Sequence, residues 1–186
     1  MLKLNKKENK MENKMEKNRV SQANIIAKEC IVSALLKLIY EKPLTTITIS
    51  ELTKKAGVSR MTFYRNYDSK EEVFTGHLDE IFEHYWNNDN ADKENGIYYD
   101  VEHMKSCFEY IYQHKEFLEG LIQCGMGLLF LDKLTYYISE KWKKYADKYE
   151  LTAFTGSLYN LFILWISTGY KEDVDKMAKK IEKIYS

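Results

Sequence analysis

The chain contains a single proline, Pro43, and only eight glycines among its 186 residues. Proline interrupts a helix because it lacks a backbone N–H, and glycine weakens one because it has the most conformational freedom to lose. A chain with so few of both is most economically explained as mostly helical. With 45% apolar and 30% charged residues, its composition is that of a globular protein. The sequence therefore predicts an all-α fold, with about nine helices by the pattern of apolar residues.

Basic residues gather in the first 70 positions, which hold 15 Lys or Arg against 7 Asp or Glu, a net charge of +8. Residues 71–186 hold 13 against 21, a net charge of −8, so the whole chain is neutral. This asymmetry suggests that only the N-terminal part of the chain binds a polyanion. A second explanation remains open, because a lysine-rich tail over residues 1–19 supplies +4 of the excess.

Residues 1–18 are polar and lysine-rich, and the tetrapeptide ENKM occurs twice in succession within them. Nothing in this segment can build a core, so we expect a flexible arm. No apolar stretch follows the lysines, which argues against a signal peptide. The arm is either a solvated tail or a basic arm that contacts DNA.

A helical pattern begins at Ser21, where Ala27, Ile31, Leu35 and Leu38 recur at three- and four-residue steps and Pro43 ends the run. Another helix is expected from Asp68 and Ser69 up to a polar loop at Asn87–Gly96. The later helices are expected near residues 98–113, 115–123, 126–145, 150–169 and 171–184.

The segment Ile49–Tyr67 reads ISELTKKAGVSRMTFYRNY. Thr48 precedes it as an N-cap with Glu51 at the capping-box spacing, Gly57 allows a sharp turn, and Ser59 caps a second short helix. Two short helices joined by a turn that contains glycine form a helix-turn-helix. Leu52 and Phe63 would face inward. Ser59, Arg60, Met61, Thr62, Tyr64 and Arg65 would then point largely outward, where such side chains can reach bases and phosphates in a major groove.

The run TITISELTKKAGVSRMTFYRNYDSKEEVF closely resembles the DNA-binding domain of TetR-family transcriptional regulators. The resemblance implies an all-helical homodimer whose second helix-turn-helix helix enters the major groove. It implies that bases are faced by Ser59, Arg60 and Thr62. It implies that the DNA backbone is held by Thr48, Ser50, Tyr64, Tyr67 and Lys70. One departure is Thr53, where the family usually has alanine; a threonine hydroxyl can bond back to a helix carbonyl, so we expect it to be tolerated.

After the arm at 1–18, the resemblance implies a DNA-binding domain at 19–68 and an effector-binding and dimerisation domain at 69–186. In this last part large side chains recur on successive helices, and a pocket between the helices would be apolar with a few polar groups. The candidate pocket residues are Trp86, Met104, Phe108, Tyr112, Phe117, Met126, Phe130 and Tyr137. Plain core packing is the alternative explanation for these residues, and no pattern identifies a ligand.

Leu151–Tyr170 contains twenty residues without a charge, long enough to span a bilayer. Six Ser, Thr and Asn side chains make it too polar for a membrane helix, so we expect a helix buried on two sides, one against its own domain and one against a second subunit. The last helix carries a matching apolar stripe. The expected dimer interface comprises Phe154, Ser157, Leu158, Leu161, Phe162, Trp165, Met177 and Ile181.

No catalytic constellation is visible, because the chain has neither a glycine-rich phosphate loop nor a nucleophile elbow. His77 and His84 lie seven residues apart, too far for the zinc-binding pair of a helix, although Glu80 lies between them. Three widely spaced cysteines exclude a disulfide-dense scaffold and a cysteine-based zinc module, and they suit a reducing cytoplasm. We therefore expect no enzyme activity, no metal and no cofactor.

The sequence thus favours a cytoplasmic, homodimeric, sequence-specific DNA-binding regulator. As in most of the resembling family, we expect a repressor that binds double-stranded DNA at a palindromic operator and is released by a small effector. The alternative is an adaptor or coactivator whose C-terminal half binds a protein partner. The operator, the target gene, the effector and the sign of regulation are not encoded in any pattern that the sequence displays.

Overall fold

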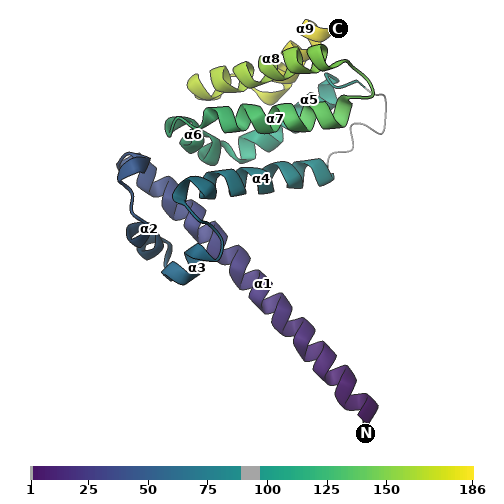
Figure 1. Cartoon of the computed structure of the whole chain (residues 1–186). Coiled ribbons are helices and arrows are strands. Elements are labelled where there is room, and N and C mark those ends of the chain that lie inside the picture. Colours follow the sequence, from purple (N-terminus) through teal and green to yellow (C-terminus); the bar gives the residue numbers. More distant parts are fainter. Residues whose placement is uncertain (1, 89–96) are drawn as a thin grey trace. The chain divides into compact units, whose positions relative to one another are not determined.

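The computed structural model describes residues 2–88 and 97–186, with side chains from Gln22 onward. Within these ranges the regular structure is entirely helical, which confirms the predicted all-α fold (Figure 1). The elements are α1 Leu2–Glu41, the short 3₁₀ helix η1 Leu44–Thr46, α2 Ile49–Ala56, α3 Arg60–Tyr64, α4 Lys70–Asn88, α5 Val101–Gln113, α6 Lys115–Gln123, α7 Gly127–Trp142, α8 Lys148–Ser167 and α9 Val174–Tyr185.

The chain divides into two compact units, Met1–Phe74 and Thr75–Ser186. The division falls six residues later than the predicted domain boundary at residue 68. The first turn of α4 belongs to the N-terminal unit, where Val73 and Phe74 are each only 1% exposed. Since α4 runs from Lys70 to Asn88, it is one continuous helix that contributes residues to both units.

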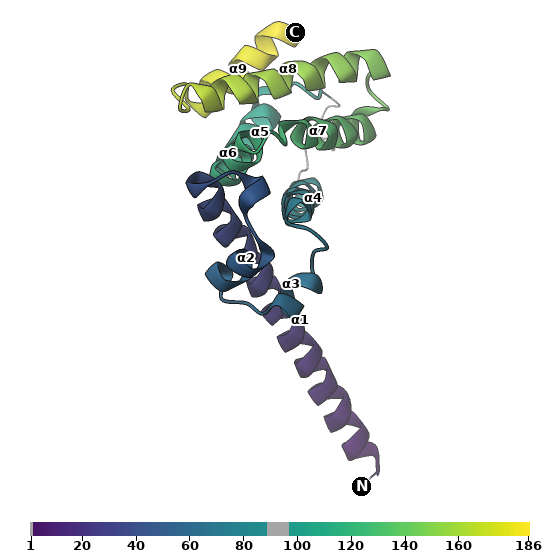
Figure 2. The ribbon, with the colours of Figure 1, turned by 60° about the vertical axis from the view of Figure 1, so that its left-hand side comes forward.

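Helix α1 begins at Leu2, not near Ser21 as the apolar pattern suggested. From Leu2 onward the segment predicted to be an arm is the first part of α1, and its backbone extends well past α2 and α3 (Figures 1 and 2). Its flexibility stays a prediction. No proline or glycine precedes Pro43, and Lys, Glu, Met and Leu are good helix formers. A helix already nucleated by the packed part of α1 can propagate through such residues.

The packed part of α1 follows the predicted stripe. Ala27, Ile31, Leu35 and Leu38 are all less than 9% exposed, so this face of the helix forms the core of the N-terminal unit. The helix ends at Glu41, because proline at position 43 disfavours the helical backbone of the residue before it. Residues beyond Pro43 then turn into η1 and α2.

In the C-terminal unit, α5 packs extensively against α9, and α7 lies beside α8 (Figures 1 and 2). The predicted helices match the observed ones to within three residues at each end. Most of the predicted polar loop Asn87–Gly96 lies outside the described residues, and α4 continues to Asn88. None of the described helices combines the length and the hydropathy that crossing a membrane would need.

Helix α8 begins at a complete capping box, in which the Asp147 carboxylate accepts from the backbone N–H of Glu150 and the Glu150 carboxylate accepts from that of Asp147. Its inward face carries large apolar side chains such as Phe162, which is fully buried. The ring of Phe162 lies 4.8 Å from that of Phe108 and 5.7 Å from that of Phe130. This aromatic cluster is the centre of the C-terminal core.

Candidate nucleic-acid interface and interior cavity

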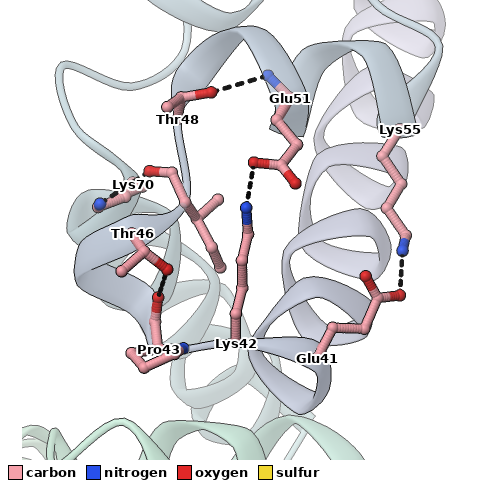
Figure 3. A network of polar contacts seen from close by, with 9 residues as sticks. Glu41, Lys42, Pro43, Thr46, Thr48, Glu51, Lys55 and Lys70 are labelled. Carbon is pink, nitrogen blue, oxygen red and sulfur yellow. Dashed lines mark hydrogen bonds and ion pairs between the residues drawn. The ribbon is translucent and has the colours of Figure 1, made fainter.

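Helix α2 is held in place by polar contacts at its start (Figure 3). The Thr48 hydroxyl accepts from the Glu51 N–H at 3.2 Å, which confirms the predicted N-cap. The Glu51 carboxylate accepts from Lys42 Nζ at 2.6 Å instead of closing a capping box. That hydrogen bond to an ammonium group holds the pKa of the Glu51 carboxyl below its ordinary value. The contact also ties α2 to the end of α1.

The turn between α2 and α3 depends on Gly57, whose φ of 68° lies in the left-handed region. Its N–H donates to the carbonyls of Lys54 and Thr53, and the Val58 N–H donates to the Thr53 carbonyl at 3.1 Å. A Cβ added at Gly57 would meet no atom within 4 Å. The requirement for glycine therefore comes from the backbone conformation and not from a lack of space.

Helix α3 begins at Ser59, whose hydroxyl accepts from the Thr62 N–H at 3.0 Å. This confirms the predicted cap, and the Ser59 and Thr62 hydroxyls also lie 2.9 Å apart. Phe63 is fully buried and anchors the inner face of the helix. Because α3 has only five residues, the cap and this one aromatic anchor largely set its orientation.

The outer face of α3 carries most of the residues predicted to read DNA. Ser59 and Arg60 are exposed, Thr62 is half-buried, and Tyr64 is 54% exposed. Met61 is 84% exposed, an unusual degree for a methionine. The structure thus brings the predicted base-facing residues together on one solvent-accessible helix face.

Two of the predicted DNA-backbone residues are positioned differently from the expectation. Tyr67 is only 3% exposed, its hydroxyl oxygen is buried, and its ring packs 5.8 Å from that of Phe63. The assignment of Tyr67 as a phosphate contact disagrees with this burial, because a phosphate cannot reach an enclosed hydroxyl. Lys70 donates from Nζ to the Ile47 carbonyl at 2.9 Å and so ties the start of α4 to the segment before α2 (Figure 3). Thr48 and Ser50 are exposed, as phosphate contacts require.

Thr53, the departure from the family pattern, is 3% exposed, and its hydroxyl donates to the Ile49 carbonyl at 2.8 Å. This is the back-bonding that the sequence predicted. The hydroxyl is satisfied within its own helix, so the substitution leaves no unpaired polar group in the core.

The C-terminal unit contains a partly open cavity of about 50 Å³ between α4, α5, α7 and α8. Three of the predicted pocket residues line it: Trp86, Met104 and Tyr137. The other five do not. Phe108, Phe117 and Phe130 are core residues at most 4% exposed, Tyr112 is 41% exposed, and Met126 is half-buried away from the cavity.

Some cavity residues were absent from the predicted set, among them Tyr110 and Lys141. Tyr110 donates from its hydroxyl to the Ile81 carbonyl at 2.9 Å, which links α5 to α4. Burial raises the pKa of the Tyr110 hydroxyl and is also the main reason for the raised pKa of Tyr137. Both tyrosines therefore stay neutral at physiological pH.

Histidines cluster near the same helices. The His84 ring stacks on the Tyr110 ring with centroids 5.9 Å apart, and the centroid of the His114 ring lies 4.7 Å from that of Tyr110. Burial lowers the pKa of His114, and the His77 and His84 imidazoles lower it further. His77 contacts Glu80 at 3.3 Å. Within the described part of the chain, no group of three His, Cys, Asp or Glu side chains is placed to hold a metal ion.

Most of the predicted dimer-interface residues are buried within the single chain. Six of them are at most 4% exposed: Phe154, Leu158, Phe162, Trp165, Met177 and Ile181. Ser157 and Leu161 are half-buried, and the Ser157 hydroxyl accepts from Tyr185 at 2.7 Å. The dimer interface stays a prediction, and within the single chain these six side chains already belong to the core of their own unit. Phe154 and Leu158 line the cavity instead.

Residues 31–75 match the family model for bacterial regulatory proteins of the tetR family. The whole chain is similar in structure to a TetR transcriptional regulator from Streptococcus agalactiae 2603V, with a TM-score of 0.62 and 19% sequence identity. That similarity covers 91% of this chain and 97% of the other. Comparison with curated protein sequences gives no match.

These findings place a segment that matches the tetR family at residues 31–75, where the helix-turn-helix lies. The chain as a whole has the fold of the solved TetR transcriptional regulator. The resemblance noted in the sequence is confirmed.

Proposed function

We propose that this protein is a homodimeric transcriptional repressor that binds a palindromic operator through α3 and leaves it when a small effector enters the cavity. The observation that carries the proposal is the outer face of α3, where Ser59, Arg60, Thr62 and Tyr64 are gathered. Such a protein acts in the cytoplasm, where its operator lies.

On DNA, Arg60 is the principal base-reading residue, because a guanidinium can donate two hydrogen bonds to one guanine. The Thr62 methyl group can contact thymine, and the Ser59 position faces the base edges at the start of the helix. Exposed Thr48, Ser50 and Tyr64 supply phosphate contacts. Lys70 adds one, because its ammonium group has two more N–H donors beside the one given to the Ile47 carbonyl.

The dimer surface that we propose is the outward face of α8. Ala153, Asn160 and Leu164 are exposed there and Gly156 is half-buried, all without charge. Leu164 is 58% exposed, and a Cβ at Gly156 would meet nothing within 4 Å, so a second helix could approach closely. The outward positions of α9, by contrast, are mainly charged. A two-fold axis through α8 would pair two copies of α3 with two half-sites.

For effector release, the supporting observation is that α4 forms one wall of the cavity and also runs into the N-terminal unit. A ligand that displaces Trp86 or Tyr85 would act directly on α4. The first residue of α4, Lys70, donates a hydrogen bond to the Ile47 carbonyl. The effector would favour a state with altered spacing between the two α3 helices, and so weaken operator binding. The cavity is the reason to favour this mechanism over an adaptor that binds a protein partner.

The test is selection of bound duplexes from a random-sequence pool by the purified protein, read by sequencing. We expect enrichment of one palindrome whose half-sites are about one helical turn apart, with affinity that falls as salt rises. Salt-sensitive binding without an enriched sequence would contradict sequence-specific regulation and would favour the adaptor. An enriched single half-site would retain DNA reading and contradict the dimer.

A further inference from the structure

The first part of α1 carries its positive and negative charges on opposite sides of the helix. Between Leu2 and Asn18 the chain has six lysines and three glutamates. On a helix of about 3.6 residues per turn, the lysine positions fall within an arc of roughly 100°, and the glutamate positions fall opposite to it. We call this arc the lysine face; it comprises Lys3, Lys6, Lys7, Lys10, Lys14 and Lys17. It is continuous over about 21 Å of helix length.

This charge pattern is the opposite of the one that stabilises a helix in water. Ion pairs along a helix need opposite charges three or four residues apart. None of the six lysines stands at either spacing from Glu8, Glu12 or Glu16. Lysines instead follow one another at these spacings, as Lys10 and Lys14 do, and like charges so placed destabilise a helix. A polyanion along the lysine face would relieve that repulsion.

The lysine face lies on the side of α1 that meets the rest of its unit. Ile31, Leu35 and Leu38 are buried in the core of the N-terminal unit, where α1 packs against α2. On the same helical count, the centre of the lysine face lies within roughly 60° of the centre of this buried face. Helix α1 extends well past α2 and α3 (Figures 1 and 2). The lysine face therefore extends the helix-turn-helix side of the unit.

We propose that the lysine face binds the phosphate backbone of the duplex that α3 reads, and that residues 2–18 gain helical stability when it does. The inference rests on the proposed function, because α3 must first bring the duplex to this unit. Charge complementarity favours duplex DNA as the occupant, since it carries one negative charge about every 1.7 Å along its axis. A helix that lies on a lipid surface needs a broad apolar face, and between Leu2 and Asn18 the apolar residues are only Leu2, Leu4, Met11 and Met15.

The test begins with a glutamine variant, which has Lys→Gln at all six positions of the lysine face. Glutamine is a good helix former, so this change removes the charges and retains the helical propensity. Binding of the full chain to the selected operator, with about one extra helical turn of duplex at each end, is measured by fluorescence anisotropy over a range of salt concentrations. If three lysines of each chain contact phosphates, the variant should bind at least about tenfold more weakly, and the slope of log K against log salt should be shallower by about 3 per chain.

An exchange variant is the matched control, because it keeps the net charge of the segment. It carries Lys6→Glu, Lys10→Glu, Lys14→Glu, Glu8→Lys, Glu12→Lys and Glu16→Lys. The exchange spreads the lysines around the helix and places opposite charges three residues apart, at positions 3 and 6, 7 and 10, and 14 and 17. We expect it to lose as much affinity as the glutamine variant. Wild-type affinity of the exchange variant would overturn the proposal, because net charge and not the lysine face would then attract DNA. Urea unfolding checks that both variants keep the fold.

Amide hydrogen exchange over residues 2–18 tests the gain of helical stability. In the wild-type protein exchange should slow when the operator duplex binds, because opening of the helix is then less favourable. In the glutamine variant the duplex should change it little. Wild-type exchange that is equal with and without duplex would overturn this part of the proposal.

Two further outcomes separate the possible failures. Tighter binding of the wild-type protein to vesicles of equal parts phosphatidylserine and phosphatidylcholine than to the duplex would overturn the proposal in favour of a membrane surface. If the wild-type protein enriches no duplex, the proposed function and this inference both fail. If it enriches a palindrome that the glutamine variant binds with unchanged affinity and salt dependence, only this inference fails. Where the inference holds, the glutamine variant should still select the same palindrome, because phosphate contacts carry no sequence information.

Discussion

Ser59 gives the clearest test of α3, because its hydroxyl caps the helix and its position is the one proposed to face the bases of the operator. In the structure the hydroxyl accepts from the Thr62 N–H at 3.0 Å. Replacing a capping serine by alanine costs about 1 kcal/mol, so Ser59→Ala should lower the free energy of unfolding by that amount. Asp173→Ala is the matched control, because Asp173 caps α9 in the same way by accepting from the Lys176 N–H at 2.8 Å. Both variants should lose similar stability, but only Ser59→Ala should weaken operator binding.

Ser59→Asp separates the two roles. Aspartate is as good a helix cap as serine, and its charge suits a helix N-terminus, so stability should be retained within about 0.5 kcal/mol. On DNA, a carboxylate about 8 Å from a phosphate, at an effective dielectric constant of about 20, costs about 2 kcal/mol. That corresponds to a loss of about thirtyfold in affinity for each half-site, with a smaller loss at high salt.

Stability is measured by urea unfolding, and operator affinity by fluorescence anisotropy over a range of salt concentrations. If folded Ser59→Asp protein binds the operator with wild-type affinity, then position 59 lies away from DNA. In that event α3 is not the helix that reads the operator.

Three other perturbations have defined outcomes. Arg60→Ala should cost about 1–3 kcal/mol per half-site and relax the preference at one base pair; an unchanged preference in a repeated duplex selection would contradict base reading by Arg60. Leu164→Asp should convert the dimer to a folded monomer in analytical ultracentrifugation, because a charge would be buried in the proposed interface. Phe162→Ala, in the core, should instead cost about 3–5 kcal/mol of stability. A dimeric Leu164→Asp protein would contradict the outward face of α8 as the interface. Burial keeps the pKa of His114 below its ordinary value of 6.5, so on acidification the imidazole of the unfolded chain is protonated before that of the folded chain. The free energy of unfolding should therefore fall as pH drops below about 6.5. His114→Asn should reduce this dependence of stability on pH in unfolding titrations, and an unchanged dependence would show that other groups cause it.

The sequence by itself determined the elements whose cause is local. Thr48, Gly57 and Ser59 act on atoms at most four residues away, through two N-caps and one left-handed turn. The back-bond of Thr53 to Ile49 is equally local. Short-range hydrogen bonds depend only on residue types at fixed spacing, and for this reason the helix-turn-helix and the exposed face of α3 could be predicted. The helix over residues 2–18 is not predicted by apolar spacing, because that segment lacks a sustained apolar stripe.

Only the tertiary structure decided what each apolar helix face meets. The recurrence of large side chains such as Phe130 on successive helices cannot distinguish a core that closes completely from one that leaves a cavity. Phe154 was assigned to a second subunit and lies beside the cavity, while Tyr67 was assigned to DNA and lies in the core. These outcomes depend on how helices distant in sequence cross, and packing is a property of that crossing, not of any single helix.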